Sequence, residues 1–227
     1  MKPTSLLLTL RHGNRASTNS SQAVTWLGHW IVVRTLLAWC HRVDRREGRK
    51  DPHGLWLVTG SSRGLGRAIV ETGLAAGNKV LATARDIESL ADLSERYGDQ
   101  VKLFALDVTD EAAAANAVMS AIDQFGSLDV VINDAGYGNL SSIEGTPLSE
   151  FRAQIETNLF GTISVTKAPL TYFREKKTGH FIQFSSVGGR IGPPGRGPYS
   201  AAKWGAEGFS EVLSREVAPL GIKVTIV

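Results

Sequence analysis

Short apolar runs alternate with longer amphipathic stretches from residue 55 to the end of the 227-residue chain, and this alternation restricts the fold more than any other feature. Six runs have the length and composition of buried strands, at residues 55–59, 80–83, 101–106, 130–132, 181–184 and 223–227. Helical spacing occurs at residues 66–76, 87–97, 111–125, 149–175 and 198–218. Because alternating strands and helices join by right-handed crossovers, the sequence predicts an α/β fold: a doubly wound parallel sheet of six strands in three α/β/α layers.

This arrangement indicates where a ligand would bind, since doubly wound sheets hold ligands in the crevice at the carboxyl ends of their strands. The helical spacing also places a proline inside a predicted helix. Pro169 lies within the range 149–175, and we expect a kink or break there because proline lacks the N–H group that a helix interior needs.

The basic character of the chain is confined to its first 53 residues. They hold nine Lys or Arg and three Asp or Glu, whereas residues 54–227 hold sixteen Lys or Arg and nineteen Asp or Glu. The isoelectric point of about 9.1 therefore does not indicate a nucleic-acid partner. We expect a basic, poorly ordered N-terminal extension over residues 1–53 and a folded domain over residues 54–227.

Several interpretations of the extension stay open. Residues 1–43 contain no acidic residue and resemble an organellar transit peptide. The apolar stretch 24–40 is interrupted by His29 and Arg34, which argues against a membrane span, although Trp26 and Trp30 would share one face of a membrane-surface helix. We prefer a leader of low order, or upstream sequence outside the mature protein. The expected location is cytoplasmic, or organellar if residues 1–43 act as a transit peptide.

Cysteine and histidine usage excludes two further classes of protein. One cysteine, Cys40, allows no internal disulfide. The five histidines form no HExxH motif and no Cys/His cluster, so no metal site is expected.

A glycine-rich turn follows the first predicted strand and reads Thr59-Gly60-Ser61-Ser62-Arg63-Gly64-Leu65-Gly66. Glycine lets the backbone turn sharply and approach a pyrophosphate, and a helix that begins near Gly64 directs free N–H groups at such an anion. No Gly-Lys-Ser/Thr follows, which argues against a P-loop. A strand before the turn and a helix after it are the context of a dinucleotide site.

Tyr199 and Lys203 are four residues apart in a predicted helix, so their side chains share one face. An ammonium group beside a phenol lowers the pKa of the phenol from its ordinary value of about 10, which suits acid/base chemistry. Ser186 follows the fifth predicted strand, and the Gly/Pro-rich loop 188–198 can fold back to bring its hydroxyl beside the phenol.

The spacing Gly-x-x-x-Gly-x-Gly resembles the short-chain dehydrogenase/reductase family. Further motifs of that family follow in order: Asp107-Val108, Asn133-Asp134-Ala135-Gly136, Asn158, Ser186 and Tyr199-x-x-x-Lys203. The resemblance covers residues 54–227 and implies a Rossmann-fold, dinucleotide-binding catalytic domain. The implied activity is that of an oxidoreductase which moves hydride between a nicotinamide cofactor and a small-molecule carbonyl or alcohol.

The resemblance also implies roles for single residues. Ser186, thirteen residues before Tyr199 as in the family, would bond the substrate oxygen, with Tyr199 as general acid/base. Lys203 would tune Tyr199 and hold the nicotinamide ribose. Asn158 would complete a proton relay through water to Lys203, although by itself it fits better a polar residue that satisfies a helix irregularity. The implied cofactor-binding residues are Gly60, Ser62, Arg63, Gly64, Leu65, Gly66, Arg85, Asp107, Val108, Asn133, Ala135, Gly136, Tyr199 and Lys203.

The end of the second predicted strand favours NADP(H) over NAD(H). NAD enzymes usually carry a carboxylate there for the ribose 2′-hydroxyl, but the sequence reads Thr83-Ala84-Arg85 with no acid before Asp86. Arg85 and Arg63 can together pair with a 2′-phosphate, as in NADP(H)-preferring members. Each arginine taken alone also fits a solvated surface charge.

Two departures from the family pattern matter. Asp134 stands where the family usually has asparagine, so a carboxylate replaces a donor amide. The chain stops at Val227, where family members continue into a Pro-Gly turn, a substrate-covering segment and a seventh strand, so we expect a fragment or a shortened product. The second hypothesis is therefore a catalytically impaired nucleotide-binding or interaction protein. No Gly-x-Ser-x-Gly motif supports a hydrolase.

Partners beyond the small-molecule substrate follow only by analogy. Family members commonly pair through the helix that carries the tyrosine and the long helix before it, which implies a homodimer or homotetramer. No feature of the sequence identifies the substrate.

Overall fold

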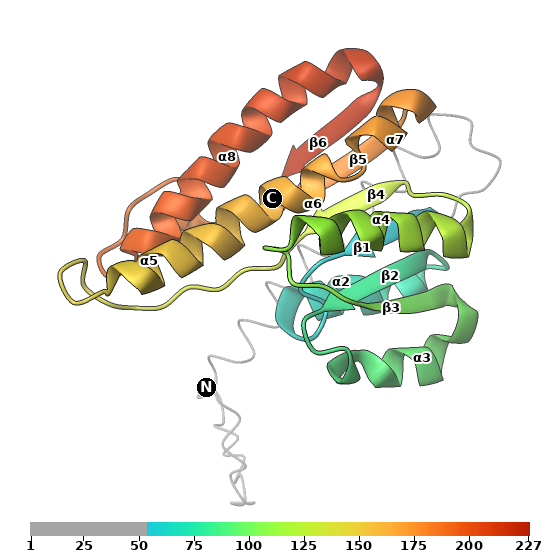
Figure 1. Ribbon diagram of the computed structural model, residues 1–227, viewed down its shortest axis with the longest axis horizontal. Coiled ribbons are helices and arrows are strands. Elements are labelled where there is room, and N and C mark those ends of the chain that lie inside the picture. The colour runs from blue at the N-terminus through green and yellow to red at the C-terminus, as the bar shows by residue number, and fades with distance from the viewer. Residues whose placement is uncertain (1–53) are drawn as a thin grey trace, which may run out of the picture.

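The computed structural model describes residues 54–227. The predictions for residues 1–53, including the transit peptide and the membrane-surface helix, lie outside the described residues. Six strands form one parallel sheet in the order β3-β2-β1-β4-β5-β6, and helices cover both of its faces (Figure 1). This confirms the predicted doubly wound fold.

The elements lie close to the predicted ranges. The strands are β1 (Leu55–Val58), β2 (Lys79–Ala84), β3 (Val101–Ala105), β4 (Val130–Asn133), β5 (Gly179–Gln183) and β6 (Ile222–Ile226). The α-helices are α2 (Gly64–Ala75), α3 (Ala91–Tyr97), α4 (Glu111–Phe125), α5 (Leu148–Ile155), α6 (Gly161–Lys167), α7 (Leu170–Lys176) and α8 (Gly197–Val217). Short 3-10 helices are η1 (Glu88–Leu90), η2 (Gly98–Gln100), η4 (Val187–Gly189) and η5 (Ala218–Leu220).

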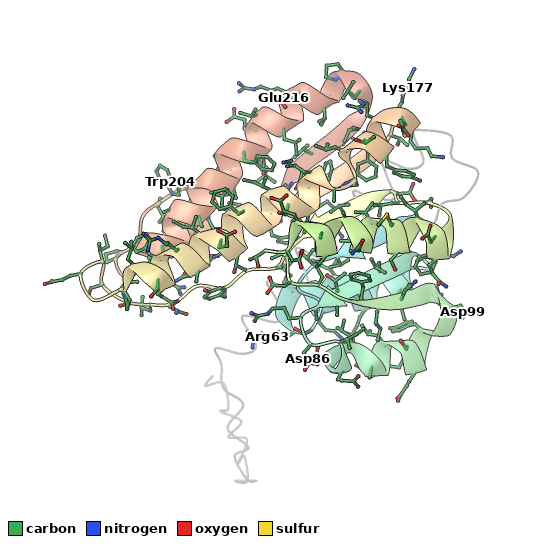
Figure 2. All side chains as sticks on the ribbon, viewed as in Figure 1. Arg63, Asp86, Asp99, Lys177, Trp204 and Glu216 are labelled. Atoms are coloured by element: carbon green, nitrogen blue, oxygen red, sulfur yellow. The ribbon has the colours of Figure 1, made fainter. Side chains whose placement is uncertain are left out.

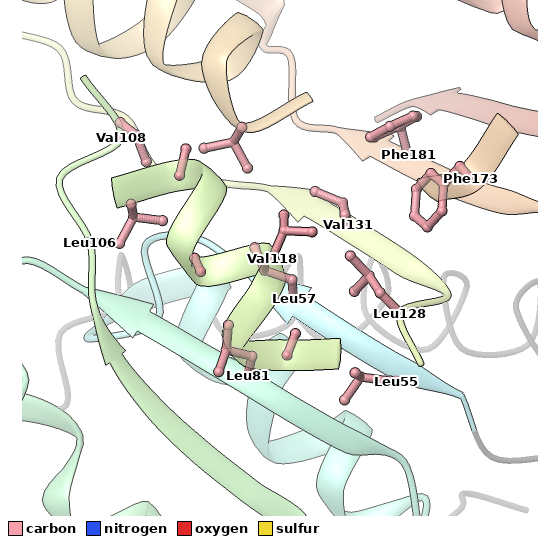
Figure 3. Close-up of a cluster of buried hydrophobic side chains, with 14 of the residues drawn as sticks. Leu55, Leu57, Leu81, Leu106, Val108, Val118, Leu128, Val131, Phe173 and Phe181 are labelled. Atoms are coloured by element: carbon pink, nitrogen blue, oxygen red, sulfur yellow. The ribbon is translucent and has the colours of Figure 1, made fainter. Parts of the chain in front are cut away.

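Each face of the sheet has its own apolar core, because successive strand residues point to opposite faces. Leu57, Val131 and Phe181 pack against α4, α6, α7 and α8 (Figure 3). The alternate residues, such as Val58 and Ile132, pack against α2 and α3. Each fully buried side chain of this size contributes roughly 1.5–3 kcal/mol to folding, so both helical layers are anchored and the loops at the carboxyl ends of the strands have a rigid base.

The helical range 149–175 is broken twice. The break at Pro169 was expected, and α6 ends just before it while α7 begins just after it. The second irregularity is a π-helical turn, η3 (Glu156–Phe160), which separates α5 from α6. The sequence pointed to it only through Asn158, which by itself fits a polar residue that satisfies a helix irregularity. Asn158 lies in this turn and is fully buried.

The strand order reverses between β1 and β4, since the chain runs outward from β1 to β3 and then returns to the other side of β1. Ligands of doubly wound sheets bind at this switch point. None of the helices described between residues 54 and 227 has the length and apolar composition that a bilayer-crossing segment needs.

Candidate active site

The glycine-rich turn lies at the carboxyl end of β1, next to the switch point. Gly60 and Gly64 have φ values of +71° and +61°, which glycine adopts without steric cost. A Cβ on Gly66 would lie 2.4 Å from the backbone oxygen of Gly60, so the turn closes on itself. Arg63 precedes α2 and makes no side-chain cap bond, which leaves N–H groups of the first turn available to an anion.

A cavity of about 360 Å³, here called the turn cavity, lies beside this turn. A Cβ on Gly64 would meet no atom within 4 Å, so the turn is open on one side. Ten of the predicted cofactor residues line the cavity: Gly60, Ser62, Arg63, Gly64, Leu65, Arg85, Asp107, Val108, Ala135 and Gly136.

Both arginines that the sequence suggested for a 2′-phosphate reach the turn cavity. Neither Arg63 nor Arg85 forms an ion pair with another residue of 54–227. Hydrogen bonds from the Thr109 N–H (3.0 Å) and hydroxyl (2.8 Å) hold the pKa of Asp107 below its ordinary value, and the charge of Arg85 adds to this effect. Figure 2 labels Arg63 beside Asp86, at the opposite end of the sheet from Asp99.

Two predicted cofactor residues lie behind the cavity wall. Gly66 is buried against Gly60. Asn133 is 4% exposed, and its amide nitrogen donates to Thr166 Oγ1 (3.0 Å) and Gln183 Oε1 (2.9 Å). Asn133 therefore joins β4 to β5 and α6 and does not line the turn cavity.

A second cavity of about 440 Å³, here called the tyrosine cavity, is lined by Ser186, Tyr199 and Lys203. The structure thus brings together three of the four residues predicted to be catalytic. Four residues line both cavities: Leu65, Asp134, Gly136 and Tyr137. The two cavities are therefore neighbours, and one extended ligand can occupy both.

The Tyr199 ring is held between two loops that approach it through glycine. A Cβ on Gly138 would lie 2.6 Å from Tyr199 Cδ2, and a Cβ on Gly188 would lie 3.1 Å from Cε1. Lys203, one turn later on α8, has its Nζ 5.9 Å from the ring centroid. The shared helix face predicted from the sequence is therefore present.

Lys203 is 6% exposed, and its Nζ donates a 2.7 Å hydrogen bond to the Phe184 backbone oxygen at the end of β5. Burial lowers the pKa of Lys203, and the charge of Asp134 opposes this shift. A hydrogen-bonded ammonium group on the tyrosine face of α8 is thus fixed in position.

Ser186 and Ser185 both line the tyrosine cavity, but they are bonded differently. Ser186 Oγ accepts the Gly188 N–H at 3.1 Å, which leaves its hydroxyl proton to donate to a ligand. Ser185 Oγ donates to Glu207 Oε1 at 2.5 Å, and Glu207 pairs with Arg190. The proton of Ser185 is therefore already used within the protein.

Asn158 does not line the tyrosine cavity. Its side chain forms two hydrogen bonds with the backbone of Tyr137: Nδ2 donates to the oxygen at 2.8 Å, and Oδ1 accepts the N–H at 2.9 Å. Its own backbone oxygen accepts the Thr162 hydroxyl at 3.1 Å. Asn158 thus holds the loop after β4 from within the π turn.

Sequence reasoning assigned no site role to several residues that line the cavities or support them, although Thr59 and Asp134 belong to motifs that it identified. Tyr137 and Asp134 line both cavities, and Thr157 lines the turn cavity. The Thr59 hydroxyl accepts the N–H groups of Asp134 (3.1 Å) and Ala135 (3.0 Å), which joins the loop after β4 to the end of β1. Thr59 and Asp134 directly follow β1 and β4, and Tyr137 lies in the loop after β4, so the rule that ligands bind at strand carboxyl ends could have found these three.

The sequence of this chain is similar to those of known proteins. The sequence profile of a family described as "short chain dehydrogenase" matches residues 55–227. Oxidoreductase BOA17 of Botryotinia fuckeliana is 50% identical over 173 residues, which are 76% of this chain and 63% of that protein. The chain therefore spans less than two thirds of the length of this relative.

Solved structures agree in fold. A short-chain dehydrogenase from Streptomyces avermitilis has a TM-score of 0.74 and 41% identity over 77% of this chain and 64% of its own. A structure described as ElxO with NADP bound has a TM-score of 0.73 and 27% identity, covering 77% of this chain and 72% of its own.

Proposed function

The chain belongs to the short-chain dehydrogenase family, and from this premise we propose that it is an NADP(H)-dependent oxidoreductase acting on a small-molecule carbonyl or alcohol. The observation that carries the proposal is the convergence of Ser186, Tyr199 and Lys203 on one cavity beside the glycine-rich turn. A phenol, a hydroxyl and an ammonium group at one point are suited to move a proton to or from an oxygen atom.

A dinucleotide is proposed to lie along the turn cavity and to reach the tyrosine cavity. The open turn at Gly64 and the start of α2, which lacks a side-chain cap, suit a pyrophosphate. When bound there, a nicotinamide cofactor supplies hydride in reduction and takes it in oxidation. The residues proposed to hold the cofactor are those that line the turn cavity, together with Lys203 at the ribose next to the nicotinamide. Gly66 and Asn133 lie behind the wall of this cavity.

The chain's own residues handle the proton. In reduction, Tyr199 Oη donates its proton to the substrate oxygen while the Ser186 hydroxyl donates a hydrogen bond to the same atom, which stabilises the negative charge that develops there. In oxidation, Tyr199 takes the proton back. The ammonium group of Lys203 favours the phenolate and so assists both directions.

Preference for NADP(H) is part of the proposal. Arg63 and Arg85 both line the turn cavity and have no ion-pair partner within residues 54–227. A 2′-phosphate would give both guanidinium groups a partner. A structural relative described with NADP bound supports this choice.

Self-association through α5 and α8 is also proposed. These helices pack against each other, yet Leu148 on α5 and Trp204 and Val212 on α8 are each more than half exposed. Exposed apolar side chains gathered on adjacent helices are typical of a subunit interface. A homodimer would bury them.

NADPH consumption by the 227-residue chain against a panel of aldehydes and ketones tests the proposed activity. We expect Tyr199→Phe to lower kcat by about 10²-fold or more, the usual size of a general-acid contribution, while NADPH still binds. Tyr97→Phe removes a phenol outside both cavities and serves as the matched control. NADPH binding without turnover of any substrate by the unsubstituted chain would favour a nucleotide-binding protein instead.

A further inference from the structure

Arg196 is a second cation at the tyrosine cavity, and no step of the proposed reaction uses it. It lies one residue before α8 and lines this cavity together with Tyr199 and Lys203. It does not line the turn cavity, where the phosphates of the cofactor are proposed to bind. The guanidinium group of Arg196 is therefore placed for the substrate rather than for the cofactor.

The main chain of Arg196 is fixed at the start of α8. Its N–H donates to the Pro193 oxygen at 3.3 Å, and its oxygen accepts the Ser200 N–H at 2.8 Å. A β-bridge pairs Arg196 with Ser141, whose N–H donates to the Gly195 oxygen at 3.0 Å. The loop after β4 and the loop before α8 are thus joined, and the side chain extends from a fixed point.

The guanidinium group of Arg196 lies over the ring of Tyr199. Its Cζ is 5.7 Å from the ring centroid, which is within the range of a cation–π contact. Its Nη1 donates a long hydrogen bond of 3.4 Å to the Gly138 oxygen. A guanidinium group has five N–H donors, so these two contacts leave donors available to a ligand beside the proposed general acid/base.

Few acidic groups compete for this guanidinium. Arg196 belongs to none of the ion pairs formed among residues 54–227. Asp134, the one acid that lines the same cavity, packs on the glycine-rich turn at Gly66. Glu150 accepts two side-chain hydrogen bonds and lines a separate cavity. The positive end of the α8 dipole lies beside Arg196 and adds to its attraction for an anion.

We propose that Arg196 is a specificity residue that binds a carboxylate group of the substrate, so that the preferred substrates are oxo acids and, in oxidation, hydroxy acids. One guanidinium group matches the single charge and the two oxygens of a carboxylate. Ser186 and Tyr199 would hold the carbonyl oxygen while Arg196 holds the carboxylate. The inference rests on the proposed function and names the substrate class of the same site.

Substrate pairs that differ only in charge test the inference. NADPH-dependent reduction of phenylglyoxylate, benzoylacetate and levulinate is compared with reduction of their methyl esters; the three acids carry the carboxylate at increasing distances from the carbonyl. We expect kcat/KM for at least one acid to exceed that of its ester by roughly 10- to 100-fold, the usual effect of a charge-assisted hydrogen bond.

Substitution of Arg196 should remove this preference. Arg196→Gln keeps an amide donor but has no charge, so we expect the acid and its ester to become equal, with the ester little changed. Arg196→Lys keeps the charge without the planar fork and should retain part of the preference. Arg174→Gln removes an exposed arginine of α7 that lines neither cavity, and it should keep the full preference.

A merely structural role for Arg196, as a support for the Tyr199 ring, would lower the rates for acids and esters alike. An unchanged ratio in Arg196→Gln, or no acid preference in the unsubstituted chain, would therefore overturn the inference.

Saturation-transfer NMR on the same three pairs measures binding without turnover. At least one acid should bind the unsubstituted chain more tightly than its ester and lose this advantage in Arg196→Gln. If this difference is present but no chain reduces any carbonyl, the carboxylate site stands and the proposed function fails. If carbonyls are reduced with no difference between acid and ester, the proposed function stands and the inference fails.

Discussion

The side-chain nitrogen of Lys203 lies 2.7 Å from the backbone oxygen of Phe184, so the middle of the site is tied to the carboxyl end of β5. The bond joins α8 to the strand that precedes Ser186. Ser186 follows β5 and Tyr199 lies on α8, and the Lys203 hydrogen bond joins these two elements. Lys203 therefore has a structural role in addition to its charge.

Lys203→Met should separate these two roles. Methionine fills a similar volume without a charge or a donor, so we expect kcat for carbonyl reduction to fall by about 10²-fold or more. The melting temperature should change little, because the lost hydrogen bond is offset by removal of a buried charge. Steady-state kinetics and thermal unfolding measure the two effects; a large loss of stability with retained kcat would contradict the assignment.

Gly138→Ala should move the ring of Tyr199, the proposed general acid/base. The new Cβ would lie 2.6 Å from Tyr199 Cδ2, a distance at which the ring has to shift. Because small misplacements of reacting groups reduce rates strongly, we expect kcat to fall by about 10²-fold with little change in NADPH affinity. Gly208→Ala on α8 meets no atom within 4 Å and provides the control, which should keep full activity.

Arg85→Asp combined with Arg63→Ala should shift the preference from NADPH toward NADH. Loss of two charge-assisted contacts is expected to raise the KM for NADPH by about 10-fold or more. Arg215→Ala, whose side chain pairs with Glu211 on α8, should leave both KM values unchanged. Unaltered NADPH kinetics in the double variant would show that the arginines are ordinary surface charges.

Asp134→Asn should change how stability depends on pH. The pKa of Asp134 is raised from 3.8 to about 6 in the folded chain, so the folded state binds this proton more tightly than the unfolded state. Its stabilising effect is full below about pH 4 and is lost as the pH rises through 6, a change of about 3 kcal/mol at most. Denaturant unfolding from pH 4 to 8 should show this decline in the unsubstituted chain and a smaller one in the variant.

Trp204→Glu should weaken self-association. Trp204 projects from α8 in Figure 2 and is 55% exposed, and a charge placed there would disfavour burial against a second copy. Light scattering after size exclusion should give a smaller mass for the variant. Met119→Glu, equally exposed on α4, should not alter the mass. Equal masses for all three chains would exclude this face as the interface.

Features that depend on neighbouring residues in the sequence were predictable. The glycine-rich turn is an example, because the φ values of Gly60 and Gly64 and the start of α2 follow from local backbone requirements. The choice of Ser186 over Ser185 rested on the spacing to Tyr199 and stays a prediction; the Ser185 hydroxyl donates to Glu207.

Features that depend on distant contacts were not predictable. Asn133 was expected to hold the cofactor, yet its amide bonds Thr166 and Gln183, which are 33 and 50 residues away. The contacts of Asn158 within the π turn are also distant in sequence, since its side chain bonds the backbone of Tyr137, 21 residues earlier. No pattern within a single helix or strand records such pairs.

The π turn at Glu156–Phe160 also has a consequence for helical phase. A π turn holds one extra residue, which rotates all later side chains by about 100°. Before it, α5 packs on α8; after it, α6 packs on α4 and β4. The two halves of this nearly continuous helix therefore pack against different neighbours. A one-residue deletion in the π turn would rotate Val165 and Thr166 away from the sheet.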